Sequence, residues 1–181
     1  MGPFFLDLWF LLAILCLLVG ESVTKWRSRL ISVHKFRGAS NLTIDAKGRM
    51  VLPARYRERL AEICSGQMVV TIDTDKPCLL IYPLPDWEVV EDKINALPTF
   101  NKTARRIQRM LIGYATDVEV DGNGRMLLSA PLRSYAQLEK KVVLIGQGNR
   151  FELWDEQSWE QLCTEDGDDD EIPPALAELS L

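Results

Sequence analysis

Apolar and polar residues recur with two different periods along the chain. A change of period marks the point where one predicted secondary-structure element ends and the next begins. Residues 50–52 (Met-Val-Leu) form a short apolar run that predicts a β-strand. Pro53 stops this strand because proline has no amide hydrogen to donate to a sheet. In residues 54–64 the apolar side chains recur every three or four positions, with Leu60 and Ile63 on one side, which predicts a helix.

The residues just before this strand have the composition of a tight turn. Asp45 can accept hydrogen bonds from backbone amides ahead of it, and Gly48 can adopt a positive φ without a Cβ clash. Residues 44–64 therefore predict a strand end, a turn, a strand and a helix. Five basic and two acidic residues lie between Asp45 and Arg59.

The whole unit occurs twice. Residues 120–133, VDGNGRMLLSAPLR, repeat residues 44–57 with an offset of 76, and seven of these fourteen positions are identical. The identical residues of the second copy are Asp121, Gly124, Arg125, Met126, Leu128, Ala130 and Arg133. Strand-like blocks that end in an aromatic pair follow both copies. Chance rarely preserves a turn, a strand and a later aromatic pair together, so the pattern indicates an internal structural repeat.

Several stretches resemble the MraZ family of bacterial transcription regulators: FRGAS, both D-x-x-G-R turns, YPLPDW and FELWDEQSW, which together span residues 36–159. Each half is also similar to a SpoVT-AbrB domain, a small DNA-binding module built from swapped hairpins. The resemblance implies an α+β fold in which two tandem swapped-hairpin units form a pseudo-symmetric, β-barrel-like core with connecting helices.

The expected organisation follows from the repeat and from shifts in composition. Between the repeats we expect helices over residues 86–97, with Asp86 as the N-cap, and over residues 102–114. The basic row on the second helix is either solvated or a bridge to the acidic helix before it. The expected parts are a leader at 1–35, a first domain at 39–86, a helical connection at 87–114, a second domain at 115–158 and a disordered acidic tail at 160–181.

The net charge of −5 does not exclude a nucleic-acid partner, because the charge is unevenly distributed. Residues 36–159 contain 17 Lys and Arg against 16 Asp and Glu, whereas residues 160–181 contain eight acidic residues and no basic one. The acidity therefore lies in the tail, whose composition indicates a disordered segment or, alternatively, an electrostatic brake on the basic face.

The leader has two interpretations. The apolar run at residues 8–19 is shorter than the ~20 residues that a membrane helix needs, and no basic residue precedes it as in a secretory signal. It is either a membrane anchor or upstream sequence read from a misplaced start. The resemblance favours the second interpretation, since members of the family begin close to FRGAS, and a membrane partner is not expected.

No arrangement of residues indicates catalysis, so the chain is not expected to be an enzyme. The single histidine, His34, lies in the leader, and the glycines lack the spacing of a phosphate-binding loop. The four cysteines have no metal-ligand spacing and indicate reduced thiols. We therefore expect no cofactor, no metal and no small-molecule substrate.

The D-x-x-G-R turns are the candidate DNA-binding elements. Asp45 and Asp121, with Gly48 and Gly124, are expected to build the turns. The resemblance implies DNA contact through the basic turn of the first copy, where an Arg fork can bond guanine O6 and N7. The expected DNA-binding residues are Lys47, Arg49, Arg55, Arg57 and Arg125. The second copy is less basic, because Asn123 replaces the lysine and Pro131 replaces Arg55.

The resemblance further implies a cytoplasmic, nucleoid-associated regulator, most simply a repressor. It would bind double-stranded DNA at direct repeats upstream of its own operon, the division and cell-wall gene cluster, as a homo-oligomeric ring. A ring multiplies the modest contribution of each phosphate contact. Two alternatives stay open: a membrane-tethered oligomeric scaffold that uses the leader, and an AbrB-type antitoxin.

Overall fold

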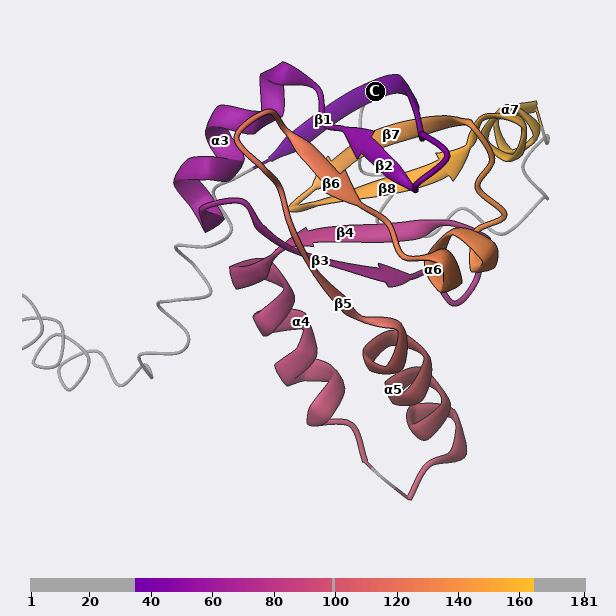
Figure 1. Cartoon of the computed structure of the whole chain (residues 1–181). Helices are drawn as coiled ribbons and strands as arrows, with labels where there is room; N and C mark the ends of the chain where they lie inside the picture. Colours follow the sequence, from indigo (N-terminus) through magenta and orange to yellow (C-terminus); the bar gives the residue numbers. More distant parts are fainter. Residues whose placement is uncertain (1–34, 99, 165–181) are drawn as a thin grey trace, which may run out of the picture.

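A computed structural model describes residues 35–98 and 100–164 of the chain (Figure 1). The expectations for the leader and for the acidic tail fall almost entirely on residues outside these ranges. Within the described ranges, no helix has the length and apolar character needed to cross a membrane.

Each repeat contains the same succession of strands and helices. The first repeat consists of β1 (Phe36–Thr43), β2 (Arg49–Val51), α3 (Ala54–Cys64), β3 (Gln67–Ile72), β4 (Leu79–Pro83) and α4 (Leu84–Asn95). After α5 (Lys102–Tyr114), the second repeat consists of β5 (Thr116–Glu119), β6 (Arg125–Leu127), α6 (Ala130–Tyr135), β7 (Lys141–Gly148), β8 (Arg150–Asp155) and α7 (Glu156–Thr164).

Strands from both repeats interleave in one antiparallel sheet. The strand order is β1-β7-β8-β4-β3-β5. If each strand is exchanged for its counterpart in the other repeat, this order is reversed, so the sheet has a pseudo-two-fold axis between β8 and β4. The expected α+β fold with two tandem units is thus confirmed. Because β1 pairs with β7 and β5 pairs with β3, each half completes the sheet of the other. The domain boundaries expected from the sequence stay a prediction.

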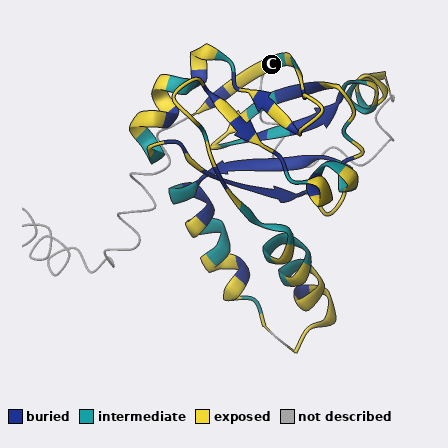
Figure 2. Cartoon of the chain, viewed as in Figure 1, coloured by how far each residue is buried: buried dark blue, intermediate teal, exposed yellow. Residues whose placement is uncertain are grey.

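A separate two-stranded ribbon, made of β2 and β6, lies over one face of this sheet. Its central cross-strand pair is Met50 and Met126, and both side chains are buried. Leu52 and Leu128 follow the two strands into the same core, and α3 adds Leu60. Figure 2 shows the buried strands of the sheet beneath the ribbon, whose surface is partly exposed. The hydrophobic core therefore lies between the ribbon and the sheet.

The other face of the sheet is covered by helices. Trp87 and Ile94 of α4 pack in a second apolar cluster with Tyr82 and Trp154 of the sheet. Helices α4 and α5 form a hairpin that projects away from the sheet (Figure 1). Helix α5 contacts both clusters, because Met110 packs against the ribbon-side core and its neighbour Leu111 against the second cluster.

Two of the helices predicted from the sequence have the expected bounds, and one does not. Residues 54–64 and 102–114 are helical as predicted. The predicted helix at 86–97 instead begins at Leu84 and ends at Asn95, so Asp86 as its N-cap is wrong. Pro83 occupies the N-cap position, and Asp86 is a buried residue of the first turn. Proline at the start of a helix loses no hydrogen bond, which allows the helix to begin two residues earlier.

Candidate nucleic-acid interface

The first turn is held by its aspartate. Oδ1 of Asp45 accepts hydrogen bonds from the backbone amides of Lys47 and Arg49, each at 2.9 Å. Its Oδ2 accepts from Nε of Arg49 at 2.7 Å and forms an ion pair with Nη2 at 2.7 Å. The Arg49 backbone amide, followed by the Arg49 side chain, lowers the pKa of Asp45 to about 2. The carboxylate is therefore ionised at any physiological pH and fixes both the turn and the arginine.

The second turn has the same backbone hydrogen bonds, but its arginine side chain is not bound by the aspartate. Asp121 accepts from the amides of Asn123 and Arg125, at 2.9 Å and 2.8 Å. These bonds, the Arg125 amide above all, lower the pKa of Asp121. Among the described residues, however, the Arg125 side chain has no hydrogen bond or ion pair. The two copies thus share the turn expected from the sequence, but only the first copy clamps its arginine.

The glycine of each turn lies against the arginine of the opposite repeat. Gly48 has a φ of +86° and Gly124 a φ of +79°, as expected for these positions. The Arg57 side chain donates through Nε to the carbonyl of Leu52 at 2.8 Å and touches Gly124. By the pseudo-symmetry, Arg133 occupies the corresponding place beside Gly48.

Backbone bonds between the copies complete the same arrangement. The amide of Leu52 donates to the carbonyl of Gly124 at 2.8 Å, and the amide of Leu128 donates to the carbonyl of Gly48 at 2.9 Å. Each strand of the ribbon therefore ends on the turn of the other copy. This crossing explains why the glycine, the leucine and the arginine are among the identical positions of the two repeats.

The outward face of the ribbon combines basic and apolar side chains. Arg49 lies opposite Leu127, and Val51 lies opposite Arg125. The two apolar residues, Val51 and Leu127, are 43% and 54% exposed, although large apolar side chains of this kind are otherwise mostly buried here. A groove of about 410 Å³ runs beside the ribbon and is lined by both arginines and by Lys140. The structure thus brings Arg49 and Arg125 to one surface.

The other predicted DNA-binding residues lie in different surroundings. Lys47 is exposed in the first turn. Arg55 donates to the Ser40 hydroxyl at 2.6 Å and stacks over Tyr56 at 4.7 Å from the ring centroid. Arg57 is half-buried at the second turn and does not lie beside Arg49, its neighbour in sequence. Its contacts are those of a residue that supports the turn, which sets it apart from the exposed bases.

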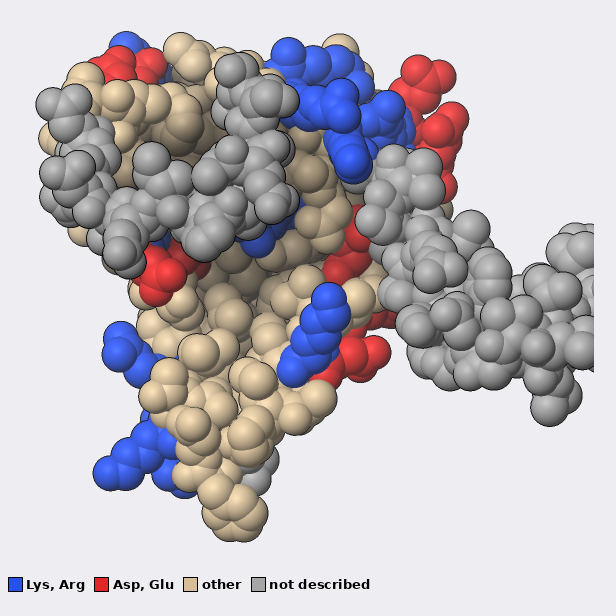
Figure 3. All heavy atoms as spheres, turned by 180° about the vertical axis from the view of Figure 1, so that it is seen from behind, with Lys and Arg blue, Asp and Glu red and all other residues tan. Residues whose placement is uncertain are grey.

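Sequence reasoning missed two basic residues near the site. Lys140 joins the groove because its carbonyl accepts the amide of Ile44 at 2.9 Å, a pairing between distant parts of the chain. Arg133 of the second repeat lies beside the first turn. The signal for this in the sequence is that Arg133 is the counterpart of Arg57 in the repeat. Figure 3 shows further basic side chains gathered on the rear of the molecule near α3 and on the projecting α4–α5 hairpin.

The described residues contain no group of His, Cys, Asp and Glu that could hold a metal ion. Burial raises the pKa of the Cys78 and Cys64 thiols, which keeps them protonated and poorly nucleophilic. Within these ranges, the ribbon surface combines a groove with two exposed arginines and is the candidate site for a partner. Its fold and charge place the chain in a class: two-repeat, swapped-hairpin proteins with a basic β-ribbon.

Comparison with known proteins identifies the family. The family described as "MraZ protein, putative antitoxin-like" matches residues 35–110 and again residues 111–175. The chain belongs to the MraZ family.

Three relatives carry the same name. A protein named "Transcriptional regulator MraZ" from Alkalilimnicola ehrlichii is 54% identical over 149 residues, which cover 81% of this chain and 99% of the relative. Its namesake from Halorhodospira halophila is 53% identical over 151 residues, with the same two shares. A third, from Thioalkalivibrio sulfidiphilus, is 56% identical over 124 residues, or 68% of this chain and 82% of the relative.

Proposed function

We propose that this protein is a transcription regulator that binds double-stranded DNA sequence-specifically through the β2–β6 ribbon. The relatives named as transcriptional regulators support the role. The observation that carries the proposal is the outward face of the ribbon, where Arg49 and Arg125 share one groove. The major groove of B-DNA admits a two-stranded β-ribbon, so a surface of this shape can reach base edges.

Arg49 is held ready for a base by its own turn. Asp45 occupies the Nε–H and one Nη2–H, which leaves the Nη1 hydrogens and the second Nη2–H at the end of the guanidinium. That end is the fork that bonds guanine O6 and N7. The ion pair orients an otherwise flexible side chain before binding, so less conformational entropy is lost on contact with DNA.

The apolar residues of the ribbon suit the same surface. Val51 and Leu127 each lie opposite an arginine, so an exposed apolar side chain is paired with a guanidinium group at both ends of the ribbon. Apolar side chains can contact the methyl group of thymine, which the major groove presents beside the hydrogen-bonding groups. Lys47, exposed in the first turn, is available to neutralise phosphate.

The finer features of the proposal come from the family resemblance. The protein acts as a repressor of the division and cell-wall gene cluster, in the cytoplasm and at the nucleoid, as a homo-oligomeric ring on direct repeats. The sheet supports assembly, because β1 and β5 are edge strands with unpaired backbone groups. Helix α5 adds half-buried apolar residues, including Ile107 and Ile112, that a neighbouring subunit could cover.

The test is a fluorescence-anisotropy titration of the protein's own upstream DNA against a scrambled duplex. Arg49→Ala removes the fork, and Arg49→Lys retains the charge but not the bidentate geometry. Both are expected to lose roughly 5- to 150-fold in specific affinity per subunit, because one bidentate contact discriminates by ~1–3 kcal/mol. Arg49→Lys should retain more of its binding to scrambled DNA, since that binding depends on charge.

Arg125→Ala serves as the comparison within the repeat. The swap gives each turn one arginine from the opposite copy, so within the turns themselves the basic residues differ by Lys47 against Asn123. We expect a smaller loss for Arg125→Ala because its side chain is not oriented by a carboxylate. Circular dichroism and light scattering control for folding and assembly. Normal specific binding by a folded Arg49→Ala protein would reject the ribbon as the reading surface.

A further inference from the structure

Helix α5 presents a row of basic side chains that the ribbon surface does not include. The row consists of Lys102, Arg105, Arg106 and Arg109, and the helix contains no acidic residue. The spacing of three and four positions places all four on one face of the helix, and all four are exposed. We refer to these four residues as the α5 basic row.

The helix that carries the row is firmly held. The side chain of Asn101 caps its N-terminus and accepts from the amide of Thr103 at 2.8 Å. Gln108 donates to the carbonyl of Ile94 on α4 at 3.0 Å, which ties the two helices of the hairpin together. The carbonyl of Leu111 accepts from the Thr71 hydroxyl at 2.6 Å, which ties the helix to the sheet. The basic row therefore projects from a scaffold of defined position.

No partner in the described part of the chain neutralises the row. Within residues 35–98 and 100–164, none of its four side chains forms an ion pair or a hydrogen bond. The neighbouring helix α4 carries Glu91 and Asp92, yet the bridge between the helices that the sequence allowed does not form. Like charges four residues apart disfavour a helix. Among the described residues the row therefore remains a group of like charges without a counter-charge, which a polyanion would supply.

We propose that the α5 basic row is a second DNA-binding surface, which contacts the phosphate backbone beside the segment that the ribbon reads. The inference rests on the proposed DNA binding and extends it. From Lys102 to Arg109 the helix rises by seven steps of 1.5 Å, or roughly 10 Å, enough to face about three phosphates of one strand. Phosphate contacts set the position and register of a protein on DNA without reading its sequence.

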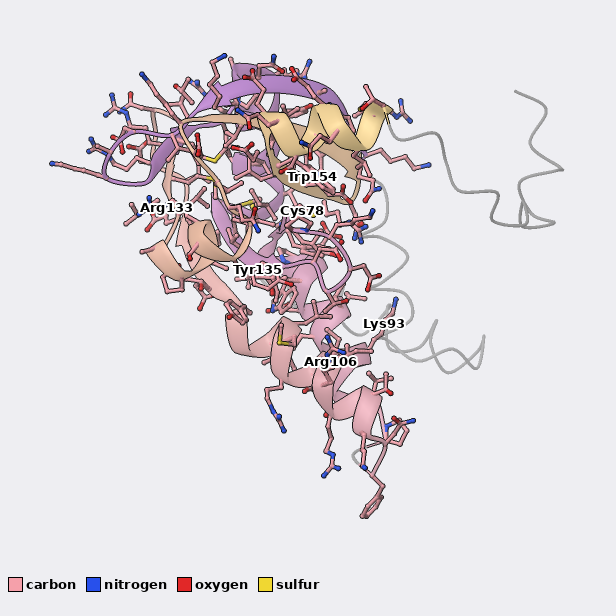
Figure 4. The ribbon with its side chains drawn as sticks, turned by 90° about the vertical axis from the view of Figure 1, so that its right-hand side faces the viewer. Cys78, Lys93, Arg106, Arg133, Tyr135 and Trp154 are labelled. Carbon is pink, nitrogen blue, oxygen red and sulfur yellow. The ribbon has the colours of Figure 1, made fainter. Side chains whose placement is uncertain are left out.

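The location of the row agrees with a flanking contact. The hairpin extends away from the sheet, so α5 does not lie on the ribbon face itself (Figure 1). In Figure 4, Arg106 lies on the projecting hairpin near Lys93, apart from Arg133 on the other side of the view, and Arg133 lies beside Gly48 of the first turn. The row contributes affinity wherever the duplex extends past the segment held by the ribbon.

The test compares the full chain with its Arg105→Gln/Arg109→Gln variant in anisotropy titrations at several salt concentrations between about 50 and 200 mM. If each arginine neutralises one phosphate, the slope of log K against log salt becomes less steep by about 1.8 in the variant. The loss should be equal on upstream and scrambled DNA, and it should vanish on duplexes shortened to the direct repeats. Lys76→Gln, an exposed base in the β3–β4 turn, is the matched control and should leave the slope unchanged.

The outcomes separate this inference from the proposed function. If the unmodified chain shows no preference for upstream DNA, the proposed function fails, and the inference fails with it. If the chain binds specifically but the double variant keeps the full salt slope, only the inference fails. A change in the mass of the double variant by light scattering without DNA also overturns it, because the row would then bind an acidic surface of another subunit. Arg49→Lys should show the opposite pattern, with lost specificity and a retained slope.

Discussion

Replacement of Gly48 by alanine should destabilise the protein through two separable effects. The backbone at Gly48 has a φ of +86°, a conformation that side chains with a Cβ rarely adopt. A Cβ at this position would also lie 2.7 Å from the Leu128 carbonyl oxygen and 2.8 Å from Nε of Arg133. The carbonyl belongs to the backbone just after β6, so relief of this contact requires the ribbon to shift.

The size of the effect follows from these contacts. Forcing a residue with a Cβ into this region costs about 1–3 kcal/mol. A shift of the ribbon weakens the hydrogen bond from the Leu128 amide to the Gly48 carbonyl, which contributes about 0.5–1.5 kcal/mol. We therefore expect Gly48→Ala to reduce the free energy of unfolding by about 1.5–4.5 kcal/mol.

Two other glycines separate the two effects. Gly38 also has a positive φ, +89°, but its Cβ would meet only the end of the flexible Arg55 side chain, at 3.4 Å. Gly38→Ala should therefore cost the backbone strain alone, about 1–3 kcal/mol. Gly122 does not have a positive φ, and no atom lies within 4 Å of the point that its Cβ would occupy, so Gly122→Ala should be neutral or slightly stabilising.

The assay is thermal and guanidinium-induced unfolding followed by circular dichroism, with all variants at one protein concentration because an oligomer's Tm depends on concentration. For a chain of this size, 1 kcal/mol corresponds to roughly 2–4 °C, so Gly48→Ala should lower Tm by about 10 °C. The expected order of stability, from most to least stable, is Gly122→Ala, Gly38→Ala and Gly48→Ala. If Gly48→Ala is as stable as Gly38→Ala, the contact with the opposite repeat contributes nothing.

Further expectations concern the arginines and the stability of the protein at low pH. Arg57→Ala should lower the free energy of unfolding by about 1.5–3 kcal/mol, because it removes a charged donor to the Leu52 carbonyl. Arg49→Ala should lower it much less in the same unfolding assay, because the ion pair of Arg49 with Asp45 is exposed to solvent. Similar losses for both would contradict their assigned roles. The depressed pKa of Asp45 means that its contribution to stability is complete above its ordinary pKa of 3.8 and is lost as the pH falls through about 2. NMR titration of the carboxyl carbon measures this directly, and a midpoint near 3.8 would exclude the bonds to Arg49 in solution.

Local signals in the sequence predicted the local structure well. The helices at 54–64 and 102–114 follow from the period of their apolar residues, and the turns follow from an aspartate placed ahead of a glycine. The predicted start of α4 was wrong, because Asp86 has the chemistry of an N-cap but Pro83, three residues earlier, has the φ that a helix start accepts.

Spatial neighbours across the repeat were beyond local reasoning. The sequence places Arg57 eight residues from Arg49, which suggested a common basic surface. In the structure the strands cross, so Arg57 lies at the second turn and Arg133 at the first. The groove beside the ribbon depends in the same way on a backbone pairing between Ile44 and Lys140. Such contacts are set by topology, and only the identity of residues between the copies hinted at them.

The crossing of the two copies also bears on how this architecture can evolve. Two separate chains with one repeat each would present two identical turns, and any substitution would appear in both. Here both turns belong to one polypeptide, so the pseudo-two-fold scaffold persists while the side chains on it diverge independently. The first turn has a lysine and a clamped arginine, whereas the second has an asparagine and a freer arginine. The two ends of the pseudo-symmetric framework therefore differ in charge, which suits the proposed function, in which the two ends of a DNA repeat have to be distinguished.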